Sequence, residues 1–167
     1  AAAIEVKTDT VAPASQTATR WQRLIPAYAL ALAEQAETDE SLVVLDADLA
    51  KDCGLLPFEE RYPDRFIECG IAEQDMVSQA GALALQGMKP VVHSFACFLT
   101  ARANEQIYNN ASENSRVIYT GSLAGLLPGG PGHSHQAVRD LAALSGVPGL
   151  ALIAPGWEAE VSLALSY

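Results

Sequence analysis

Short apolar runs alternate with longer segments of helical periodicity along most of this chain. Polar residues or glycines bound each run, as they bound buried strands. The runs predict strands at residues 42–45, 66–69, 91–94, 117–120 and 150–154. The longer segments predict helices at residues 21–37, 72–86, 98–112 and 136–145, and from residue 157 onward. This alternation predicts an α/β fold, with right-handed β–α–β units and a parallel sheet of about five to six strands covered by helices on both faces.

Length and periodicity predict one structured domain behind an irregular leading segment. The chain has 167 residues, of which 50% are hydrophobic, enough for a sizeable core. Residues 1–18 lack sustained periodicity and predict a flexible N-terminal arm, which leaves residues 19–167 as the domain. The last helical pattern reaches Tyr167 without a stop signal, so either the domain ends on that helix or the chain is part of a longer protein.

Charge and cysteine content narrow the possible partners. The formal net charge of −10 argues against binding to nucleic acids and to anionic membranes. Cys53, Cys69 and Cys97 are odd in number and widely spaced, as expected for reduced thiols. The sequence shows neither an apolar run of roughly 20 residues nor a basic-then-apolar signal peptide. We therefore expect a cytoplasmic protein.

Four segments follow predicted strands and should gather at the carboxyl edge of the sheet, where open α/β folds bind ligands. These segments are residues 46–48, 70–73, 93–98 and 120–136. The last one is a long glycine-rich loop that ends in two histidines, and long structured loops in compact domains are usually functional. The sequence therefore predicts a ligand site at this edge.

Three motifs in these segments carry a resemblance to a known family. They read IECGIAEQDM at residues 67–76, HSFACF at 93–98 and GHSHQ at 132–136. In this order they resemble the pyrimidine-binding domains of transketolase-like thiamine-diphosphate enzymes. That group includes transketolase, deoxyxylulose-phosphate synthase and the beta subunits of 2-oxoacid dehydrogenases. The resemblance extends with interruptions from about Leu42 to the C-terminus and implies the thiamine-diphosphate-binding fold.

The resemblance implies that Glu73 is catalytic and binds the cofactor. A carboxyl group hydrogen-bonded to the pyrimidine ring nitrogen favours the imino tautomer, which can take a proton from the thiazolium carbon. The alternative is that Glu73 only offsets the helix dipole from the first turn. Phe95 and Phe98 stand where the family places aromatic side chains that stack on the pyrimidine ring. Their alternative role is packing at a strand-to-helix junction.

The histidines supply candidates for substrate contact. The resemblance matches His135 and Gln136 to a family segment that contacts substrate oxygens, where an imidazole can donate to a carbonyl or developing alkoxide. His133, His93 and Asp48 are further substrate-binding candidates. The alternative for the two loop histidines is capping of the next helix. Since no third ligand lies at a suitable spacing, we expect no metal site among these residues.

The chain also departs from transketolase in three places. Ala101 stands where transketolase has a tyrosine, and Gly121 stands where it has a histidine. The stretch GGPG at residues 129–132 lacks the carboxylate that reads sugar hydroxyls in transketolase. An acyl donor or a different ketose therefore fits as well as a sugar phosphate.

The sequence holds no Gly-Asp-Gly motif with a downstream asparagine, which the family uses to hold metal and diphosphate. The resemblance thus implies one part of a split enzyme that uses thiamine diphosphate, with Mg²⁺ held by a diphosphate-binding partner domain or subunit. It would transfer a two-carbon ketol or acyl unit from a small-molecule substrate, as a homo- or hetero-oligomer. The alternatives are a 2-oxoacid dehydrogenase beta subunit and a non-catalytic assembly or regulatory domain.

Overall fold

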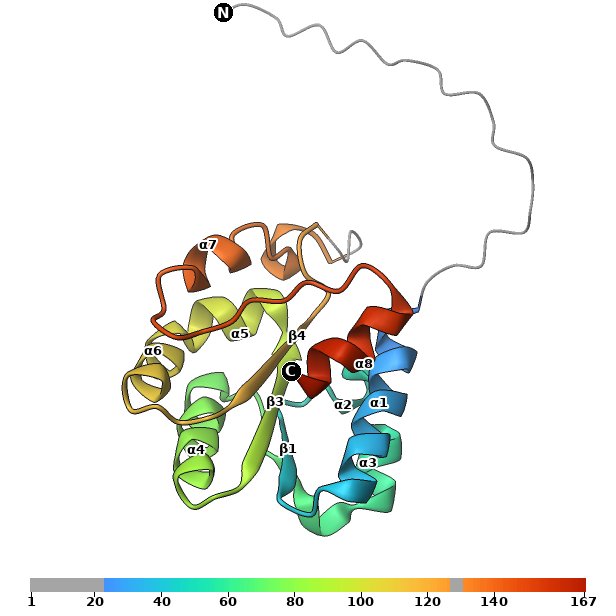
Figure 1. Cartoon of the computed structure of the whole chain (residues 1–167). Coiled ribbons are helices and arrows are strands. Elements are labelled where there is room, and N and C mark those ends of the chain that lie inside the picture. Colours follow the sequence, from blue (N-terminus) through green and yellow to red (C-terminus); the bar gives the residue numbers. More distant parts are fainter. Residues whose placement is uncertain (1–22, 127–130) are drawn as a thin grey trace, which may run out of the picture.

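Four parallel strands form one sheet between two layers of helices (Figure 1). The computed structural model describes residues 23–126 and 131–167, so the predicted arm at residues 1–18 lies outside the described residues. The strands are β1 (Leu42–Asp46), β2 (Phe66–Glu68), β3 (Lys89–Phe95) and β4 (Ile118–Ser122), in the order β2-β1-β3-β4. The predicted parallel α/β fold is confirmed, although the described sheet has fewer strands than the five to six expected.

The helices divide between the two faces of the sheet (Figure 1). One face carries α1 (Leu24–Thr38), α2 (Ala50–Cys53), α3 (Leu56–Arg61) and α8 (Glu158–Ser166). The other face carries α4 (Glu73–Leu85), α5 (Ala96–Arg102), α6 (Asn104–Ser112) and α7 (Asp140–Leu144). Two 3₁₀ turns, η1 (Pro63–Arg65) and η2 (His133–His135), complete the described elements.

The inner strand β1 is buried along its whole length, and its side chains contribute to the hydrophobic cores on both faces of the sheet. Val43 and Leu45 pack into the core under α4 to α7, whereas Leu42 and Val44 pack under α1, α3 and α8. This alternation follows from the two-residue period of a strand. Full burial of each such side chain contributes roughly 1.5–3 kcal/mol. The continuous apolar run in the sequence therefore marks a strand covered on both faces.

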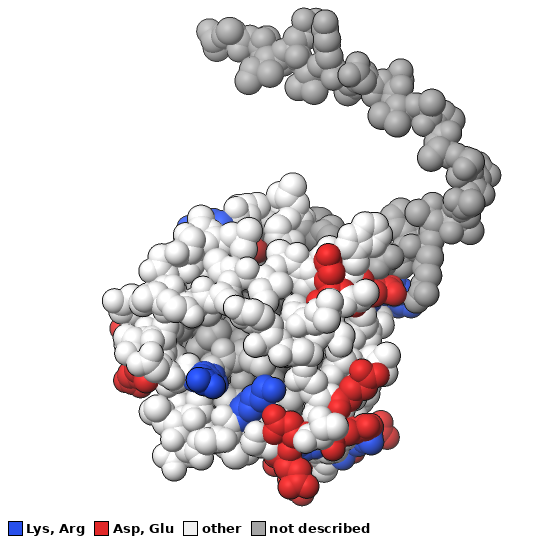
Figure 2. Space-filling model, in the orientation of Figure 1, with Lys and Arg blue, Asp and Glu red and all other residues white. Residues whose placement is uncertain are grey.

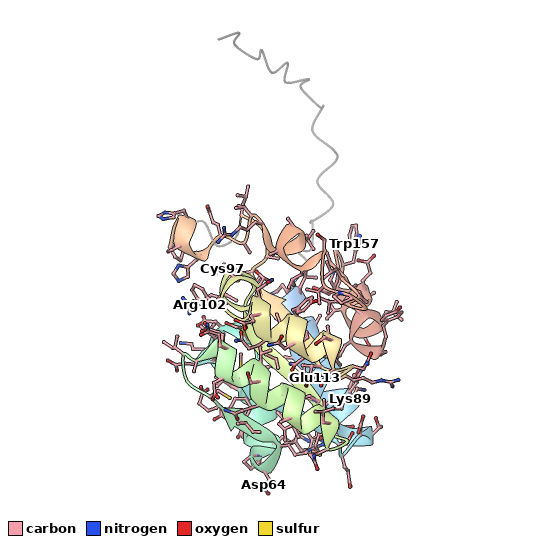
Figure 3. All side chains as sticks on the ribbon, turned by 90° about the vertical axis from the view of Figure 1, so that its left-hand side faces the viewer. Asp64, Lys89, Cys97, Arg102, Glu113 and Trp157 are labelled. Atoms are coloured by element: carbon pink, nitrogen blue, oxygen red, sulfur yellow. The ribbon has the colours of Figure 1, made fainter. Side chains whose placement is uncertain are left out.

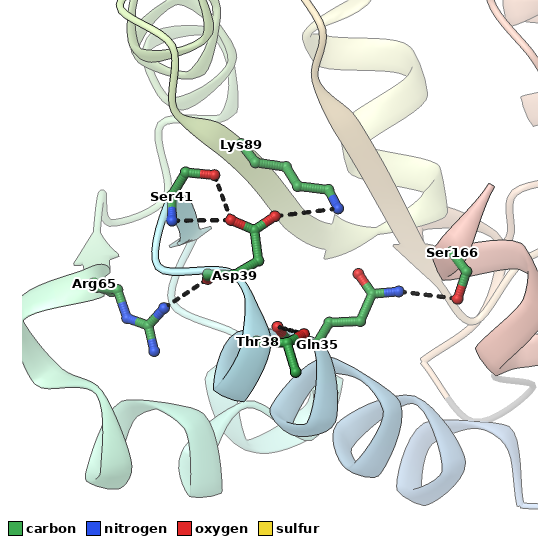
Figure 4. Close-up of polar contacts among 7 residues, drawn as sticks. All are labelled: Gln35, Thr38, Asp39, Ser41, Arg65, Lys89 and Ser166. Atoms are coloured by element: carbon green, nitrogen blue, oxygen red, sulfur yellow. Dashed lines mark hydrogen bonds and ion pairs between the residues drawn. The ribbon is translucent and has the colours of Figure 1, made fainter.

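A polar cluster holds the amino end of the sheet, opposite the predicted site (Figure 4). Asp39 accepts hydrogen bonds from Ser41 and forms an ion pair with Lys89 at the start of β3. The guanidinium of Arg65 donates to the Asp39 carbonyl. These contacts tie the end of α1 to β1, β2 and β3, which fixes the register at that edge.

Two of the predicted helices differ from the structure. The helix predicted at residues 98–112 is divided at Ala103 into α5 and α6. The Asn104 side chain donates to the Ala143 carbonyl of α7, a tertiary bond that favours a break at this point. The helix predicted at residues 136–145 begins only at Asp140, because Ala137 pairs with Gly125 as an isolated β-bridge.

The strand predicted at residues 150–154 is wrong. This segment runs from α7 to α8 without strand pairing among the described residues (Figure 1). Leu152 and Ile153 are 39% and 51% exposed. The apolar run indicates a strand only if another strand pairs with it and the side chains become buried.

The surface is unevenly charged on the face that Figure 2 shows. Acidic side chains gather over the side where α1, α3 and α8 lie, whereas much of the rest of this face is uncharged. Among the described residues, no helix is both long and apolar enough to span a bilayer.

Candidate active site at the carboxyl edge of the sheet

Glu73 begins α4 and is 4% exposed. The chain reaches it from β2 through Gly70, whose φ of 65° lies in the left-handed region that glycine adopts without strain. The Glu68 carboxylate accepts hydrogen bonds from the backbone N–H groups of Gly70 (2.6 Å) and Asp48 (3.0 Å). This turn places a buried carboxyl group at a helix N-terminus, where negative charge is stabilised.

Glu73 forms an ion pair with Arg102, the last residue of α5. The distance from Arg102 Nη1 to Glu73 Oε1 is 2.5 Å, and the Arg102 side chain is 44% exposed. Figure 3 shows Arg102 where α5 lies against α4. The guanidinium carbon also lies 4.1 Å from the centroid of the Phe98 ring, a cation–π contact. Arg102 thus joins the carboxylate to an aromatic face.

Phe98, Phe95 and His135 form an aromatic cluster next to this ion pair. The rings of Phe95 and Phe98 stack with centroids 5.8 Å apart. The His135 ring meets Phe98 edge-on at 5.1 Å and lies 6.3 Å from Phe95. The structure therefore brings Glu73, Phe95, Phe98 and His135 into one run of contacts at the carboxyl edge, as the sequence predicted.

The ends of the glycine-rich loop are held by hydrogen bonds. The Ala137 N–H donates to the Gly125 carbonyl at 2.7 Å, and the Gln136 side chain donates to the Leu126 carbonyl at 3.5 Å. Ser134 Oγ lies 3.0 Å from His135 Nδ1. These contacts direct His135 toward Phe98, whereas His133 is exposed. Residues 127–130 of the predicted glycine-rich loop, which include Gly129 and Gly130, lie outside the described residues.

His93 lies in a buried hydrogen-bond chain. Its Nδ1 donates to the Leu45 carbonyl (3.2 Å), and its Nε2 accepts from the Tyr28 hydroxyl (2.5 Å), which in turn accepts from Thr120. Burial lowers the pKa of His93 to about 4, so the ring is neutral at pH 7. Both ring nitrogens are used inside the protein, so a substrate contact by His93 stays a prediction that these bonds do not support.

A family comparison agrees with this geometry. The sequence model described as "Transketolase, pyrimidine binding domain" matches residues 22–167. The chain belongs to this family. The resemblance predicted from the three motifs is confirmed.

Curated relatives of the pyrimidine-binding domain are much longer proteins. The 1-deoxy-D-xylulose-5-phosphate synthase of Neisseria meningitidis (strain FAM18) is 37% identical over 135 residues, which cover 81% of this chain and 21% of that protein. The synthase of Natranaerobius thermophilus is 32% identical over 162 residues, covering 97% and 25%. The chain thus spans about a quarter or less of the length of these relatives.

Solved structures show the same fold as the pyrimidine-binding domain. A split-gene transketolase, described as an inactive beta4 tetramer, is 34% identical with a TM-score of 0.73, covering 84% of this chain and 46% of that chain. Transketolase from Leishmania mexicana is 25% identical with a TM-score of 0.76, covering 85% and 22%.

Two acidic residues lie at the carboxyl end of β1, and the sequence singled out only Asp48 as a candidate site residue. Asp48 is exposed, with a φ of 59°, and its side-chain role stays a prediction. Asp46 is fully buried, and its Oδ2 accepts from the Leu49 N–H at 2.7 Å. Its Oδ1 accepts no hydrogen bond from the part of the chain that the structure describes. Burial, with a smaller contribution from Glu68, raises the pKa of Asp46 to about 6.

Sequence reasoning also missed Arg102. A signal was present, because Arg102 follows Phe98 by four residues and so lies on the same side of a helix. Its partner Glu73, however, lies 29 residues away and is brought close only by the packing of α5 on α4. Within residues 23–126 and 131–167, no group of three or more histidine, cysteine, aspartate or glutamate side chains could hold a metal ion.

Proposed function

We propose that this chain supplies the pyrimidine-binding half of a thiamine-diphosphate site, in an enzyme that transfers a two-carbon ketol or acyl unit. The observation that carries the proposal is the buried Glu73 carboxyl group, in contact through Arg102 with the Phe98 ring. A planar heteroaromatic ring needs such a pair: an apolar face to lie on and a carboxyl group at its edge.

Each residue has a distinct part in this proposal. Glu73 forms a hydrogen bond with the pyrimidine ring nitrogen, and its burial keeps water from competing for that bond. Phe98 supplies the stacking surface, and Phe95 supports Phe98 from the side. When bound, thiamine diphosphate supplies the carbon that carries the two-carbon unit. His135 donates a hydrogen bond to a substrate oxygen from the rim of this site, with Gln136 and His133 beside it.

The diphosphate and Mg²⁺ would be held by a partner domain or subunit. This part of the proposal is supported by the length of the relatives, of which this chain covers a quarter or less. It is also supported by the solved relative that is described as a split-gene transketolase and forms a tetramer. Oligomerisation, a small-molecule substrate and a cytoplasmic location belong to the same proposal.

Two other functions were open from the sequence. The relatives reported above are synthases and transketolases, so they give no support to a 2-oxoacid dehydrogenase beta subunit. A non-catalytic scaffold has no need of a buried carboxyl group beside an aromatic surface, since burying a charged group is costly to the fold even when the group is paired.

Calorimetry on the two halves tests this function. Thiamine diphosphate and Mg²⁺ are titrated into the chain, into its diphosphate-binding partner and into their mixture. We expect tight binding only in the mixture, because neither half holds the whole cofactor. Absence of binding in the mixture would favour the scaffold. Tight, magnesium-dependent binding to this chain alone would contradict the half-site.

A further inference from the structure

The Arg102 guanidinium makes the two contacts that the proposed function assigns to a pyrimidine ring. It donates to Glu73 Oε1 and lies 4.1 Å from the centroid of the Phe98 ring. A guanidinium is a flat group with its N–H donors in one plane, so one group can stack on an aromatic face and donate to a carboxylate at the same time. Its shape and bonding resemble those of an aminopyrimidine edge.

We infer that Arg102 is a placeholder, which occupies the pyrimidine position of the cofactor-free chain and leaves it when the ring binds. The inference rests on the proposed function. It adds a cofactor-free state in which the chain's own Arg102 side chain blocks the pyrimidine site. Two flat groups cannot lie on the same part of the Phe98 face at stacking distance, and the carboxyl oxygen of Glu73 that faces Arg102 is already bonded. Ring binding and the Arg102 contacts therefore exclude each other.

The burial of the two partners shows which one moves. Glu73 is 4% exposed and lies at the start of α4, so its carboxylate is held inside the protein. The Arg102 side chain is 44% exposed and ends α5, so it can turn into solvent with little loss of hydration. The carboxylate stays in place while the guanidinium exchanges with the ring.

The contacts of Arg102 also explain how the chain can fold with Glu73 buried before the cofactor binds. A buried carboxylate is destabilising unless it is paired and hydrogen-bonded. Arg102 provides that pairing at the helix start and covers apolar surface on Phe98. Only the fraction of molecules with Arg102 turned away can bind the pyrimidine ring. The apparent affinity for the cofactor is therefore reduced by that fraction.

Arg61 offers a matched control for the experiment. It too forms an ion pair with a glutamate, Glu37, and lies 5.2 Å from the ring centroid of an aromatic residue, Tyr62. These contacts join α3 to the end of α1, at the amino end of the sheet and away from Glu73. Arg61→Ala therefore removes the same types of contact without touching the proposed site.

The test measures how fast and how tightly thiamine diphosphate with Mg²⁺ binds to the complex of this chain and its diphosphate-binding partner. Arg102→Ala should raise the association rate and the affinity by about tenfold, because the competing state is lost. Arg102→Lys keeps a charge but not a flat group, so it should fall between Arg102→Ala and wild type. Arg61→Ala should bind like wild type. Millimolar methylguanidinium should slow binding to Arg102→Ala and leave wild type unchanged.

Two results would overturn the inference, and they are distinguishable. If wild type binds normally but Arg102→Ala and Arg102→Lys bind no faster, Arg102 is not a competitor and the proposed function stands. If the wild-type complex does not bind thiamine diphosphate at all, the proposed function fails and the placeholder fails with it.

Discussion

Asp46→Asn should make the stability of this chain more sensitive to acid. Asp46 and His93 are both fully buried, and they are register partners on β1 and β3. Burial raises the pKa of Asp46 from 3.8 to about 6 and lowers the pKa of His93 from 6.5 to about 4. The two groups therefore respond to protons in opposite directions over the same range of pH.

The sign and size of each effect follow from proton linkage. Between pH 6.5 and 4, unfolded His93 binds a proton that the folded side chain does not, so stability falls as the pH falls. Between pH 6 and 3.8, folded Asp46 binds a proton that the unfolded side chain does not, so stability rises as the pH falls. At about 1.4 kcal/mol per pH unit, each effect is on the order of 3 kcal/mol, and the two nearly cancel.

Urea unfolding at several values between pH 7 and pH 4 measures this balance. Relative to wild type, Asp46→Asn should lose about 3 kcal/mol more free energy of unfolding over that range, because the other titrating groups cancel in the difference. Asp39→Asn should run parallel to wild type over this range, since the hydrogen bond from Ser41 lowers the pKa of Asp39 from 3.8 and its effect on stability appears only below about pH 4. Parallel curves for Asp46→Asn and wild type would refute the reasoning.

Three further substitutions test packing, the buried network and the loop. Gly81→Ala should lower the free energy of unfolding by about 1–3 kcal/mol in urea, because the added Cβ would overlap Asn110 Oδ1. Tyr28→Phe should lower it by about 1–3 kcal/mol, because buried His93 Nε2 loses its donor. His135→Ala should preserve thiazolium proton exchange in the reconstituted enzyme but reduce transfer activity by roughly two to three orders of magnitude, as kinetics would show.

Matched changes elsewhere in the chain serve as controls. Gly146→Ala adds a Cβ with no atom of the described residues within 4 Å, and Tyr108→Phe removes a hydroxyl from a half-exposed side chain. If either control is as destabilising as its buried counterpart, the packing or hydrogen-bond argument is wrong. For His135→Ala, a loss of about 1 kcal/mol in stability with full turnover would indicate a helix-capping role instead.

The site was predictable where its determinants are local. A strand, a glycine turn and a helix start lie within a few residues of Glu73, so the sequence alone placed this carboxyl group at the carboxyl edge. Phe95 and Phe98 follow the end of the next strand directly. His135 could be placed because the carboxyl ends of parallel strands share one edge.

The features that the sequence did not predict depend on contacts between distant segments. Arg102 reaches Glu73 only through the packing of α5 on α4. The break at Ala103 accompanies a bond from Asn104 to a carbonyl 39 residues away. Residues 150–154 are apolar but unpaired, which no pattern within the segment reveals.

Proton–deuterium exchange at the thiazolium carbon tests the central role of Glu73 most directly. Glu73→Gln and Asp75→Asn are compared in the complex with the diphosphate-binding partner, thiamine diphosphate and Mg²⁺. Asp75 lies in the same first turn of α4 but is exposed and accepts a hydrogen bond from the Gln79 side chain. It therefore interacts with the helix dipole as Glu73 does but lies outside the proposed site. We expect exchange to be slowed at least about a hundredfold by Glu73→Gln and unchanged by Asp75→Asn. Near-wild-type exchange in a folded, cofactor-bound Glu73→Gln complex would contradict the assignment of Glu73.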